Sequence, residues 1–406
     1  MEPLNRKGFT ILEILIVIFL IGVFSTILFF AFNSLDIIKR TRDSKRINDL
    51  QVLNSAIKVL INQNPDVFLG NENIIYLSLP DTNSNCSSYL SKLPPLYFPF
   101  SYRCVNSNDF RKINGQGWLP LDFSNLLLGI SSLPIDPLNS SDYFYAYIKK
   151  GNKYKLTAKM ESENFALMMI NDGGIEPLLY EIGSDLRIPN PHSGLVLYLP
   201  FEEGTGTTTS DLSGYNNNGF LRNFDFNSSS GWVKGKAGWG LQFDGINDWI
   251  EVNNSLSLQI AGDLSIIFWA YPTDIAKGRQ NPLGKAYGGE FDLTMETSSS
   301  LSYYHGSAGE NNGSYMSCTA ANIFSNNNWV MVGITRNNYS RKISYYKNKI
   351  LTPSNCNSWQ NPSQSNRRLG IGYEYAGYFK GVLDEIRIYN RTLSSSEIVF
   401  LYESAK

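Results

Sequence analysis

The sequence predicts an α+β stem, in which a long N-terminal helix packs on a small β-sheet, followed by an all-β head of two packed sheets. Three observations predict this class. An apolar helical stretch opens the chain, turn-rich segments with short strand-like runs follow it, and beyond residue 194 strands recur at short spacing. A chain of 406 residues is expected to hold two or three domains.

The first element is an apolar helix. No residue from 14 to 35 carries a formal charge, and as a helix this stretch would cover about 33 Å, enough for a hydrocarbon core of about 30 Å. We expect one helix over 9–64 that spans the membrane in its first half. Glu13 would cost about 2.5 to 3.5 kcal/mol in lipid unless it finds a partner, so it is a candidate functional residue.

A cleavage after Gly8 would supply that partner. The new α-amino group of Phe9 would lie about 6 Å along the helix axis from Glu13. Two adjacent chains could then pair the amine of one with the carboxylate of the other, which would neutralise both in lipid.

The residues around this carboxylate carry a specific resemblance. They read Lys7-Gly8-Phe9-Thr10-Ile11-Leu12-Glu13. This run closely resembles the cleavage and methylation motif of type IV prepilins and pseudopilins. The resemblance implies that a prepilin peptidase removes residues 1–8 as a leader, that Phe9 is N-methylated, and that Glu13 aligns each subunit during assembly.

The same resemblance implies a location. The precursor would sit in the cytoplasmic membrane as a single-pass protein with its C-terminus outside, and would then join an extracellular pilus or pseudopilus. A secretory signal would instead need a small-residue cleavage site after the apolar stretch, and Asn33-Ser34-Leu35-Asp36 does not offer one. A plain membrane anchor is the remaining alternative.

Beyond the membrane the helical period continues in an apolar stripe that should pack on a sheet. Its members are Ile47, Leu50, Leu53, Ile57 and Leu60. The helix should end at Asn64-Pro65, because the residue before a proline is pushed out of the α region. The pairs Asp36/Arg40 and Lys39/Asp43 stand four apart, so we expect opposite charges to meet on an exposed face.

A globular region over 65–182 should complete the stem. The runs 143–148 and 154–159 predict a hairpin around Lys150-Gly151-Asn152. The phrases Leu133-Pro134-Ile135-Asp136-Pro137 and Leu156-Thr157-Ala158 resemble the C-terminal half of a type IV pilin globular domain. A translocated domain favours a Cys86–Cys104 disulfide, which would contribute roughly 3 kcal/mol in the chain-entropy model.

Residues 183–193 are a linker by composition, because two prolines and a glycine without periodicity oppose helix and sheet. The head follows over 194–406. Its expected strands are 195–199, 241–243, 249–252, 264–271, 329–336, 342–346, 368–372 and 378–389. This pattern predicts a two-sheet sandwich.

The head also carries family motifs in order. They are Phe201-Glu202-Glu203-Gly204, Asp211-Leu212-Ser213-Gly214, Phe243-Asp244-Gly245-Ile246-Asn247-Asp248-Trp249 and Gly381-Val382-Leu383-Asp384-Glu385-Ile386-Arg387-Ile388-Tyr389. Together they resemble a laminin G-like, concanavalin A-like lectin jelly roll. A closing helix would be capped by Ser394 with Glu397 three residues on. An oxidising compartment favours a Cys318–Cys356 bridge.

This second resemblance implies carbohydrate binding, often with a structural calcium ion, and no organic cofactor is expected. Glu202, Asp211 and Asp384, with carbonyl groups in 214–217, are oxygen donors of the kind that calcium accepts. Turn chemistry is the alternative role for them. A sugar needs flat aromatic faces beside polar side chains. The candidates are Trp249, Tyr287, Tyr303, Tyr304, His305, Tyr373 and Tyr375.

Composition argues against a nucleic-acid partner, because the net charge is −1 and charged residues make up 17% of the chain. An enzyme would have to rest on Glu290, Asp292 and Glu296. Regular alternation leaves Glu296 about 20 Å from Glu290, whereas a retaining glycosidase needs about 5 to 5.5 Å. We therefore expect no enzyme and assign no catalytic residue.

The combined expectation is a type IV pilin-like minor subunit that displays a carbohydrate-binding, adhesin-like head. Its partners would be other pilin subunits through the N-terminal helix, the prepilin peptidase, the membrane before assembly, and a glycan or surface protein through the head. Two alternatives stay open. One is a structural pseudopilin of a type II secretion or DNA-uptake system with a protein-binding head, and the other is a glycoside hydrolase of jelly-roll fold.

Overall fold

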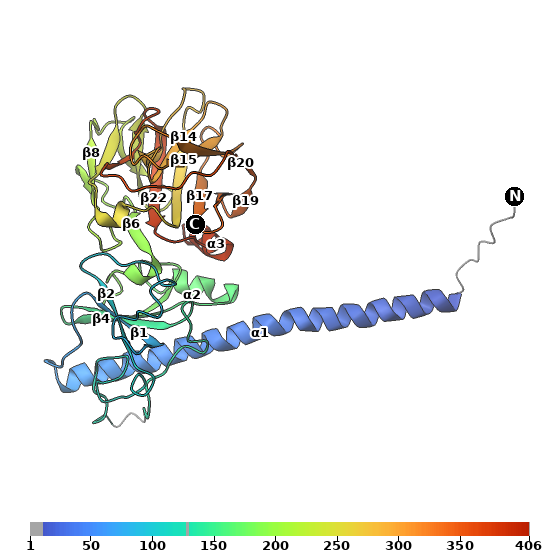
Figure 1. Ribbon diagram of the computed structural model, residues 1–406, viewed down its shortest axis with the longest axis vertical. Coiled ribbons are helices and arrows are strands. Elements are labelled where there is room, and N and C mark those ends of the chain that lie inside the picture. The colour runs from blue at the N-terminus through green and yellow to red at the C-terminus, as the bar shows by residue number, and fades with distance from the viewer. Residues whose placement is uncertain (1–10, 127–129, 406) are drawn as a thin grey trace.

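The computed structural model describes residues 11–126 and 130–405, apart from the side chains of 23–35, 163, 166 and 167. The predicted cleavage and methylation sites, Gly8 and Phe9, lie outside the described residues. A long helix projects from two globular parts, the lower one belonging to the stem and the upper one forming the head (Figure 1).

The stem is one long helix and a five-stranded sheet. The sheet order is β2-β1-β3-β4-β5, in which β1 and β2 run parallel and the other pairs antiparallel. The stem elements are α1 (Ile11–Gln63), β1 (Ile74–Pro80), β2 (Ser101–Val105), β3 (Tyr145–Lys150), β4 (Lys153–Ala158), a 3-10 turn (Glu163–Phe165), α2 (Ala166–Ile170) and β5 (Tyr180–Gly183). The α+β class predicted for the stem is confirmed.

Helix α1 behaves as its apolar stripe predicts. Leu50, Leu53 and Ile57 are fully buried, and they pack with Tyr154 and Leu156 of β4 in one core. The helix ends at Gln63, directly before Asn64-Pro65. Among the residues that the structure describes, no helix combines the length and apolarity needed to cross a bilayer.

The charges on α1 are arranged differently from the prediction. Arg40 and Asp36 pair at 2.6 Å on the surface, as expected. Asp43, however, pairs with Arg46 at 2.7 Å, and both side chains are fully buried. The expected Lys39–Asp43 pair on an exposed face is therefore wrong at Asp43, because Glu161 and Ser162 donate their backbone N–H groups to this carboxylate and fold over it.

The head is a sandwich of an eight-stranded and a nine-stranded sheet, which confirms the predicted all-β class. Its first strands are β6 (Leu195–Leu199), β7 (Thr208–Thr209), β8 (Gly219–Arg222), β9 (Gly231–Lys234), β10 (Trp239–Asp244), β11 (Trp249–Val252), β12 (Leu264–Pro272) and β13 (Leu283–Ala286). The remaining strands are β14 (Phe291–Met295), β15 (Leu301–Gly306), β16 (Tyr315–Ala320), β17 (Val330–Asn337), β18 (Lys342–Lys347), β19 (Ile350–Thr352), β20 (Ser354–Cys356), β21 (Leu369–Ile371) and β22 (Lys380–Tyr389).

In the part of the chain that the structure describes, the eight-stranded sheet packs on the stem with its outer face, and the nine-stranded sheet does not. The eight-stranded sheet runs β19-β18-β17-β12-β22-β10-β9, with β6 also on β22, and the nine-stranded sheet runs β20-β16-β15-β14-β13-β21-β11-β8-β7. Strand β12 alternates between them: Ile266 and Phe268 join the core between the sheets, while Ile267 and Trp269 join a core shared with the stem. The outer face of the nine-stranded sheet is therefore the one turned away from the stem.

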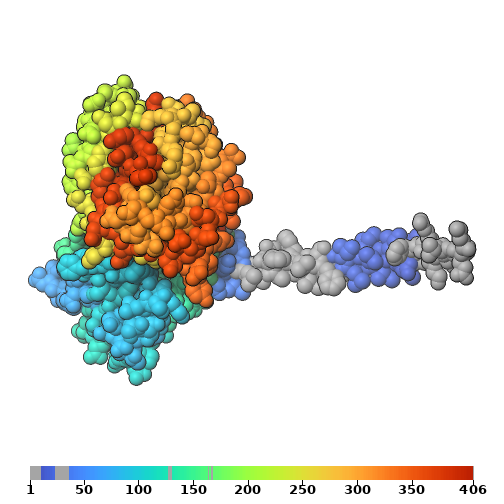
Figure 2. All heavy atoms as spheres, turned by 45° about the horizontal axis from the view of Figure 1, so that its top comes forward, coloured from blue at the N-terminus to red at the C-terminus, as the bar shows by residue number. Residues whose placement is uncertain are grey.

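The shared core also contains the last helix, α3 (Ser395–Ser404). It begins with the predicted capping box, in which Ser394 and Glu397 bond to each other's backbone N–H groups. Ile398 and Leu401 of α3 are buried in the same cluster as Leu53 of α1. The head consequently rests on the stem without a gap (Figure 2).

The connection between stem and head is packed into the protein. Gly183 still belongs to β5, and a short 3-10 turn spans Pro191–Ser193. Ile188, Asn190 and His192 are each at most 5% exposed. The 183–193 segment is thus held in place and is not a free tether, and it begins in a strand and ends in a 3-10 turn although its composition opposes regular structure.

Candidate functional site

Strand β14 positions a row of polar side chains on the outer face of the nine-stranded sheet. Phe291, Leu293 and Met295 point into the core between the sheets. Because side chains alternate along a strand, Asp292 and Thr294 face outward. Both line a pocket of about 290 Å³ on this face. The other lining residues are Arg279, Tyr287, Glu296, Tyr304, Tyr315 and Tyr375.

One side of this pocket, which we call the tyrosine pocket, is a continuous aromatic wall. The ring of Tyr287 lies 4.8 Å from that of Tyr375 and 5.3 Å from that of Tyr315. Tyr315 in turn lies 5.7 Å from Tyr304. Tyr375 is 62% exposed and Tyr315 45% exposed, so both rings keep open faces. Such faces are what sugar rings pack on.

The floor of the pocket is the buried carboxyl group of Asp292. Asn281 donates through Nδ2 to its Oδ2 at 2.9 Å, and Thr294 donates to the same oxygen at 3.1 Å. Burial, with the nearby charge of Glu374, raises the pKa of Asp292 to about 7. Near neutral pH, Asp292 is therefore present both as the carboxylic acid, which can donate a hydrogen bond, and as the carboxylate, which only accepts.

Asn281 also connects this floor to the aromatic wall. Its Oδ1 accepts hydrogen bonds from the backbone N–H groups of Ala376 and Gly377, at 2.5 and 3.1 Å. These two residues directly follow Tyr375. The amide of Asn281 thus fixes the loop that carries the most exposed ring of the wall.

The opposite rim is polar and charged. Arg279 donates through Nε to Glu296 at 3.0 Å and through Nη2 to the hydroxyl of Tyr304 at 2.9 Å. That hydroxyl donates to Glu296 at 3.1 Å. Arg279 and the Glu296 carboxylate offer donors and acceptors next to flat rings, which is the combination that hydroxyl-rich ligands require.

Three carboxyl groups lie on β14 or directly next to it. Glu290 is fully buried, where it pairs with Lys285 at 2.6 Å and accepts from the backbone N–H of Ser365 at 2.7 Å. Asp292 lies on β14 and Glu296 directly follows this strand, and both line the tyrosine pocket. A fully extended chain would place their Cα atoms about 13 Å apart, and hydrolytic carboxylate pairs are about 5 to 9.5 Å apart.

The structure divides the predicted ligand residues into groups. Tyr287, Tyr304 and Tyr375 line the tyrosine pocket. Trp249 and Tyr373 form a separate cluster, with ring centroids 6.3 Å apart and the Arg368 guanidinium 4.1 Å from the Trp249 ring.

The other two predicted rings point inward. Tyr303 is fully buried in the core between the sheets. His305 is fully buried as well; it donates through Nε2 to the carbonyl oxygen of Gln360 at 2.7 Å, and its ring lies 4.6 Å from that of Trp359. Neither ring lines the tyrosine pocket.

The carboxylates predicted as calcium ligands accept hydrogen bonds from backbone N–H groups. Asp211 accepts three backbone N–H groups, from Tyr198, Ser213 and Asn217, at 2.9 Å each. Asp384 accepts from the backbone of Lys236 and Ala237. Within the described residues no group of three or more His, Cys, Asp or Glu side chains is placed to hold a metal ion. These contacts fit turn chemistry, and calcium binding by Glu202, Asp211 and Asp384 stays a prediction.

Glu202, the third predicted ligand, accepts a hydrogen bond from the Trp239 backbone N–H at 3.2 Å. The two predicted disulfides are confirmed. Cys86 bonds to Cys104 in the stem, and Cys318 bonds to Cys356 across strands β16 and β20 in the head.

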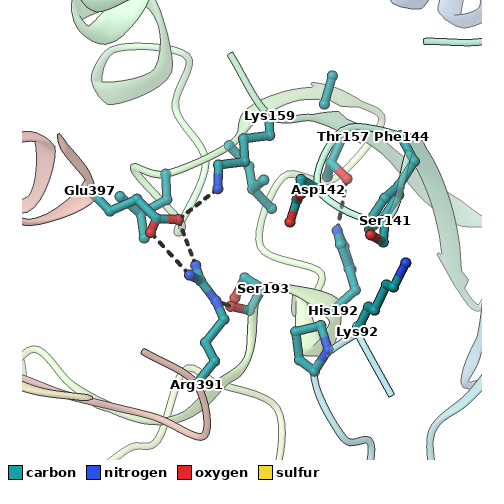
Figure 3. A pocket seen from close by; sticks show the side chains of 14 residues that line it. Lys92, Ser141, Asp142, Phe144, Thr157, Lys159, His192, Ser193, Arg391 and Glu397 are labelled. Atoms are coloured by element: carbon teal, nitrogen blue, oxygen red, sulfur yellow. Dashed lines mark hydrogen bonds and ion pairs between the residues drawn. The ribbon is translucent and has the colours of Figure 1, made fainter. Parts of the chain in front are cut away.

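A second, smaller pocket of about 90 Å³ lies at the junction of stem and head (Figure 3). Glu397 of α3 binds Arg391 at 2.9 Å and reaches across to Lys159 of the stem at 3.0 Å. His192 shares a hydrogen bond of 2.9 Å with Thr157. The ion pairs of Glu397 with Arg391 and Lys159 therefore join the two domains at this pocket.

Sequence reasoning missed Arg279 and Tyr315 because it did not predict β13, β15 or β16. A signal for Tyr315 was present. Met316, Cys318 and Ala320 alternate with polar residues and are all buried in the core between the sheets, so the opposite face of this run could have been assigned to the surface.

Residues 3–29 match the model of the prokaryotic N-terminal methylation motif, and residues 244–399 match the model of the concanavalin A-like lectin/glucanases superfamily. No curated protein matches the chain.

Several solved structures resemble part of the chain. The binding domain of Paraclostridial Mosquitocidal Protein 1 is 21% identical, with a TM-score of 0.43, over 52% of this chain and 52% of that one. The binding domain of botulinum neurotoxin DC, solved in complex with rat synaptotagmin II, is 14% identical, with a TM-score of 0.41, over 53% and 52%. The chain spans about half the length of these two structures.

Domain 4 of AbnA, a GH43 extracellular arabinanase from Geobacillus stearothermophilus solved in complex with arabinotriose, is 16% identical. The TM-score is 0.37, over 51% of this chain and 98% of that one.

Proposed function

We propose that this protein is a type IV pilin-like minor subunit whose head binds carbohydrate in the tyrosine pocket. The match of residues 3–29 to the methylation motif supports the pilin part of the proposal. The aromatic wall of Tyr287, Tyr315 and Tyr375 beside Arg279 and Glu296 is the observation that carries the binding part.

The position of the pocket also favours a display function. The pocket opens on the sheet turned away from the stem, so a head carried at the end of a filament would present it to the surroundings. The N-terminal half of α1 leaves Ile11 and Phe19 at 80% and 70% exposure. In the proposal these side chains lie in the membrane before assembly and against neighbouring subunits afterwards.

Binding is best tested with the whole chain in detergent, because stem and head share one apolar core and a separated head would expose it. Tyr287→Ala and Tyr375→Ala should each weaken binding to a glycan array hit about tenfold, since a stacked ring contributes on the order of 1 kcal/mol or more. Tyr339→Ala is the matched control, because this ring is 99% exposed on the same head.

Two outcomes of the glycan array would contradict sugar binding in the tyrosine pocket. If the wild-type chain binds no glycan, or if both pocket variants bind as tightly as Tyr339→Ala, the tyrosine pocket is not a sugar site. A protein-binding head would then be the better assignment.

The pilin part has its own test. Mass spectrometry of the mature protein should find residues 1–8 removed and a methyl group on Phe9. An epitope-tagged copy should locate to the filament, and retention of the first eight residues would leave a membrane-anchored lectin-like protein instead.

A further inference from the structure

A buried lysine, glutamate and asparagine meet where the stem sheet is covered by the connection to the head. Thr157 of β4 pairs with Glu181 of β5 and Lys155 with Gly183, so Lys155 and Glu181 share a sheet face. The neighbouring residues Tyr154 and Leu156 point to the opposite face, into the core with α1. Asn190, from the 183–193 segment, lies over the outer face.

Both nitrogen atoms of this cluster bind the same oxygen. Lys155 Nζ donates to Glu181 Oε1 at 2.5 Å, and Asn190 Nδ2 donates to that oxygen at 2.5 Å. The two nitrogens therefore lie at most about 5 Å apart, whereas attack by Nζ on the neighbouring carbon Cγ requires an approach to about 3 to 3.5 Å. Lys155 also donates to the carbonyl oxygen of Leu186 at 3.1 Å, which directs its amine.

Water is excluded from these groups. Lys155 is 0% exposed, and Glu181 and Asn190 are each 2% exposed. Burial lowers the pKa of Lys155, which favours the neutral, nucleophilic amine despite the partner charge of Glu181. The amide oxygen Oδ1 of Asn190 has no hydrogen-bond partner in the described part of the chain, so this buried amide is bonded there through Nδ2 alone, to Glu181.

We propose that Lys155 and Asn190 become joined by an isopeptide bond, with Glu181 transferring the protons. Glu181 first takes a proton from the Lys155 ammonium group. The neutral Nζ then attacks Cγ of Asn190, and the new C–N bond forms as the bond from Cγ to Nδ2 breaks. The carboxylic acid protonates the leaving nitrogen, and the attacking nitrogen gives up its second proton to the carboxylate.

The step balances without a co-reactant. An amine and a primary amide become a secondary amide and one ammonia, nothing is oxidised or reduced, and Glu181 ends as the carboxylate once ammonia leaves as ammonium. The neighbouring residue closes a competing route. Pro191 has no backbone N–H, so Asn190 cannot lose ammonia by cyclising onto the next residue.

The bond would join the head to the interior of the stem sheet. Strand β5 is an edge strand that pairs with β4 alone. A pull on the head would otherwise pass through residues 184–193 to β5 and peel it from the sheet. A covalent link from Asn190 to Lys155 would transmit the pulling force directly to β4. Strand β5 would then not be peeled from the sheet. His192, two residues further on, contacts Thr157 of the same strand face (Figure 3).

Mass spectrometry of the purified full chain under denaturing conditions tests the proposal. The wild-type mass should be lower by one ammonia than that of its Asn190→Ala variant, after correction for the substitution itself. Trypsin should not cut after Lys155, and a branched peptide should join the two segments. Lys285 is the internal control: it pairs with Glu290 at 2.6 Å, also fully buried, but no amide side chain is bonded to that carboxylate.

Two further variants test the roles of Lys155 and Glu181. Lys155→Met should restore the unlinked mass, and Glu181→Gln, which keeps the side-chain shape, should leave most of the chain unlinked. A folded wild-type chain with the unlinked mass and normal cleavage after Lys155 overturns the proposal, whether or not the variants fold. A Glu181→Gln chain linked as fully as wild type overturns the role given to Glu181.

Discussion

The guanidinium group of Arg46 on α1 binds the carboxylate of Asp136 through two parallel hydrogen bonds, of 2.6 and 2.9 Å, with both side chains fully buried. Asp136 also caps the turn that follows it, accepting from the backbone N–H of Leu138 at 2.8 Å. The pair therefore fastens the Leu133-to-Pro137 phrase to the helix, ninety positions earlier in the chain.

Asp136→Asn should destabilise the stem strongly. It removes one of the carboxylate partners of the buried Arg46, which keeps Asp43 and Glu161, so the cost should approach but not exceed the about 3 to 5 kcal/mol of a buried charge left without a partner. Denaturant unfolding of the full chain measures the loss. Arg40→Ala is the control, because its pair with Asp36 is half-exposed and should be worth at most about 1 kcal/mol. Equal losses of stability in Asp136→Asn and Arg40→Ala would show that the buried Arg46–Asp136 pair does not stabilise the stem more than a surface pair does.

Acid should loosen the junction between stem and head. Burial alone would raise the pKa of Glu397, but the charges of Arg391 and Lys159 outweigh burial and hold this pKa well below its usual value. The stabilisation is fully present above the unfolded pKa of about 4.5 and is lost as the pH falls below it toward the depressed folded value.

Glu397→Gln should reproduce this loosening at neutral pH. Limited proteolysis within 188–193, whose residues are buried or half-buried in the intact protein, reports it directly. Faster cleavage is expected in the variant, while Glu403→Gln, near the end of the same helix, should be cut like wild type. Resistance of Glu397→Gln to cleavage would show that the apolar core alone holds the head.

Stability of the head should fall as the pH rises from about 4 to about 7. Asp292 has a folded-state pKa of about 7 against an ordinary 3.8, so the folded head holds a proton that the unfolded chain has released. At about 1.4 kcal/mol per unit, the loss is on the order of 3 to 4 kcal/mol. Above the folded value the curve should level off.

Asp292→Asn should remove most of this slope and be more stable than wild type at pH 8. Thermal unfolding of both proteins across the pH range is the measurement. The exposed Asp225→Asn serves as the control and should keep the wild-type slope. A wild-type profile in Asp292→Asn would mean that another group holds the proton.

Removal of the stem disulfide should cost roughly 3 kcal/mol. Cys86 and Cys104 are separated by 18 positions, and the chain-entropy model gives about that value for such a loop. Cys86→Ala/Cys104→Ala should therefore lower the unfolding midpoint of the stem. An unchanged midpoint would imply that the unfolded stem is already compact over this loop.

Sequence patterns predicted the elements whose apolar residues repeat strongly. The expected strands at 195–199 and 249–252 coincide with β6 and β11, and the stripe through Leu50 and Ile57 lies on the buried face of α1. Strands β13 to β16 were not predicted, although inward residues alternate along β14 and β16, because each run is short and its outward residues are polar or aromatic. These strands carry the tyrosine pocket.

The sequence by itself determined the methylation motif and the sandwich class, because both rest on local spacing, and it favoured both disulfides through the expected oxidising compartment. The tertiary structure alone decided which tyrosines share a pocket, that Asp43 and Arg46 are buried, and that Lys155, Glu181 and Asn190 meet. These contacts join residues far apart in the chain, and only the pairing of strands and the packing of α1 and α3 bring them within hydrogen-bond distance.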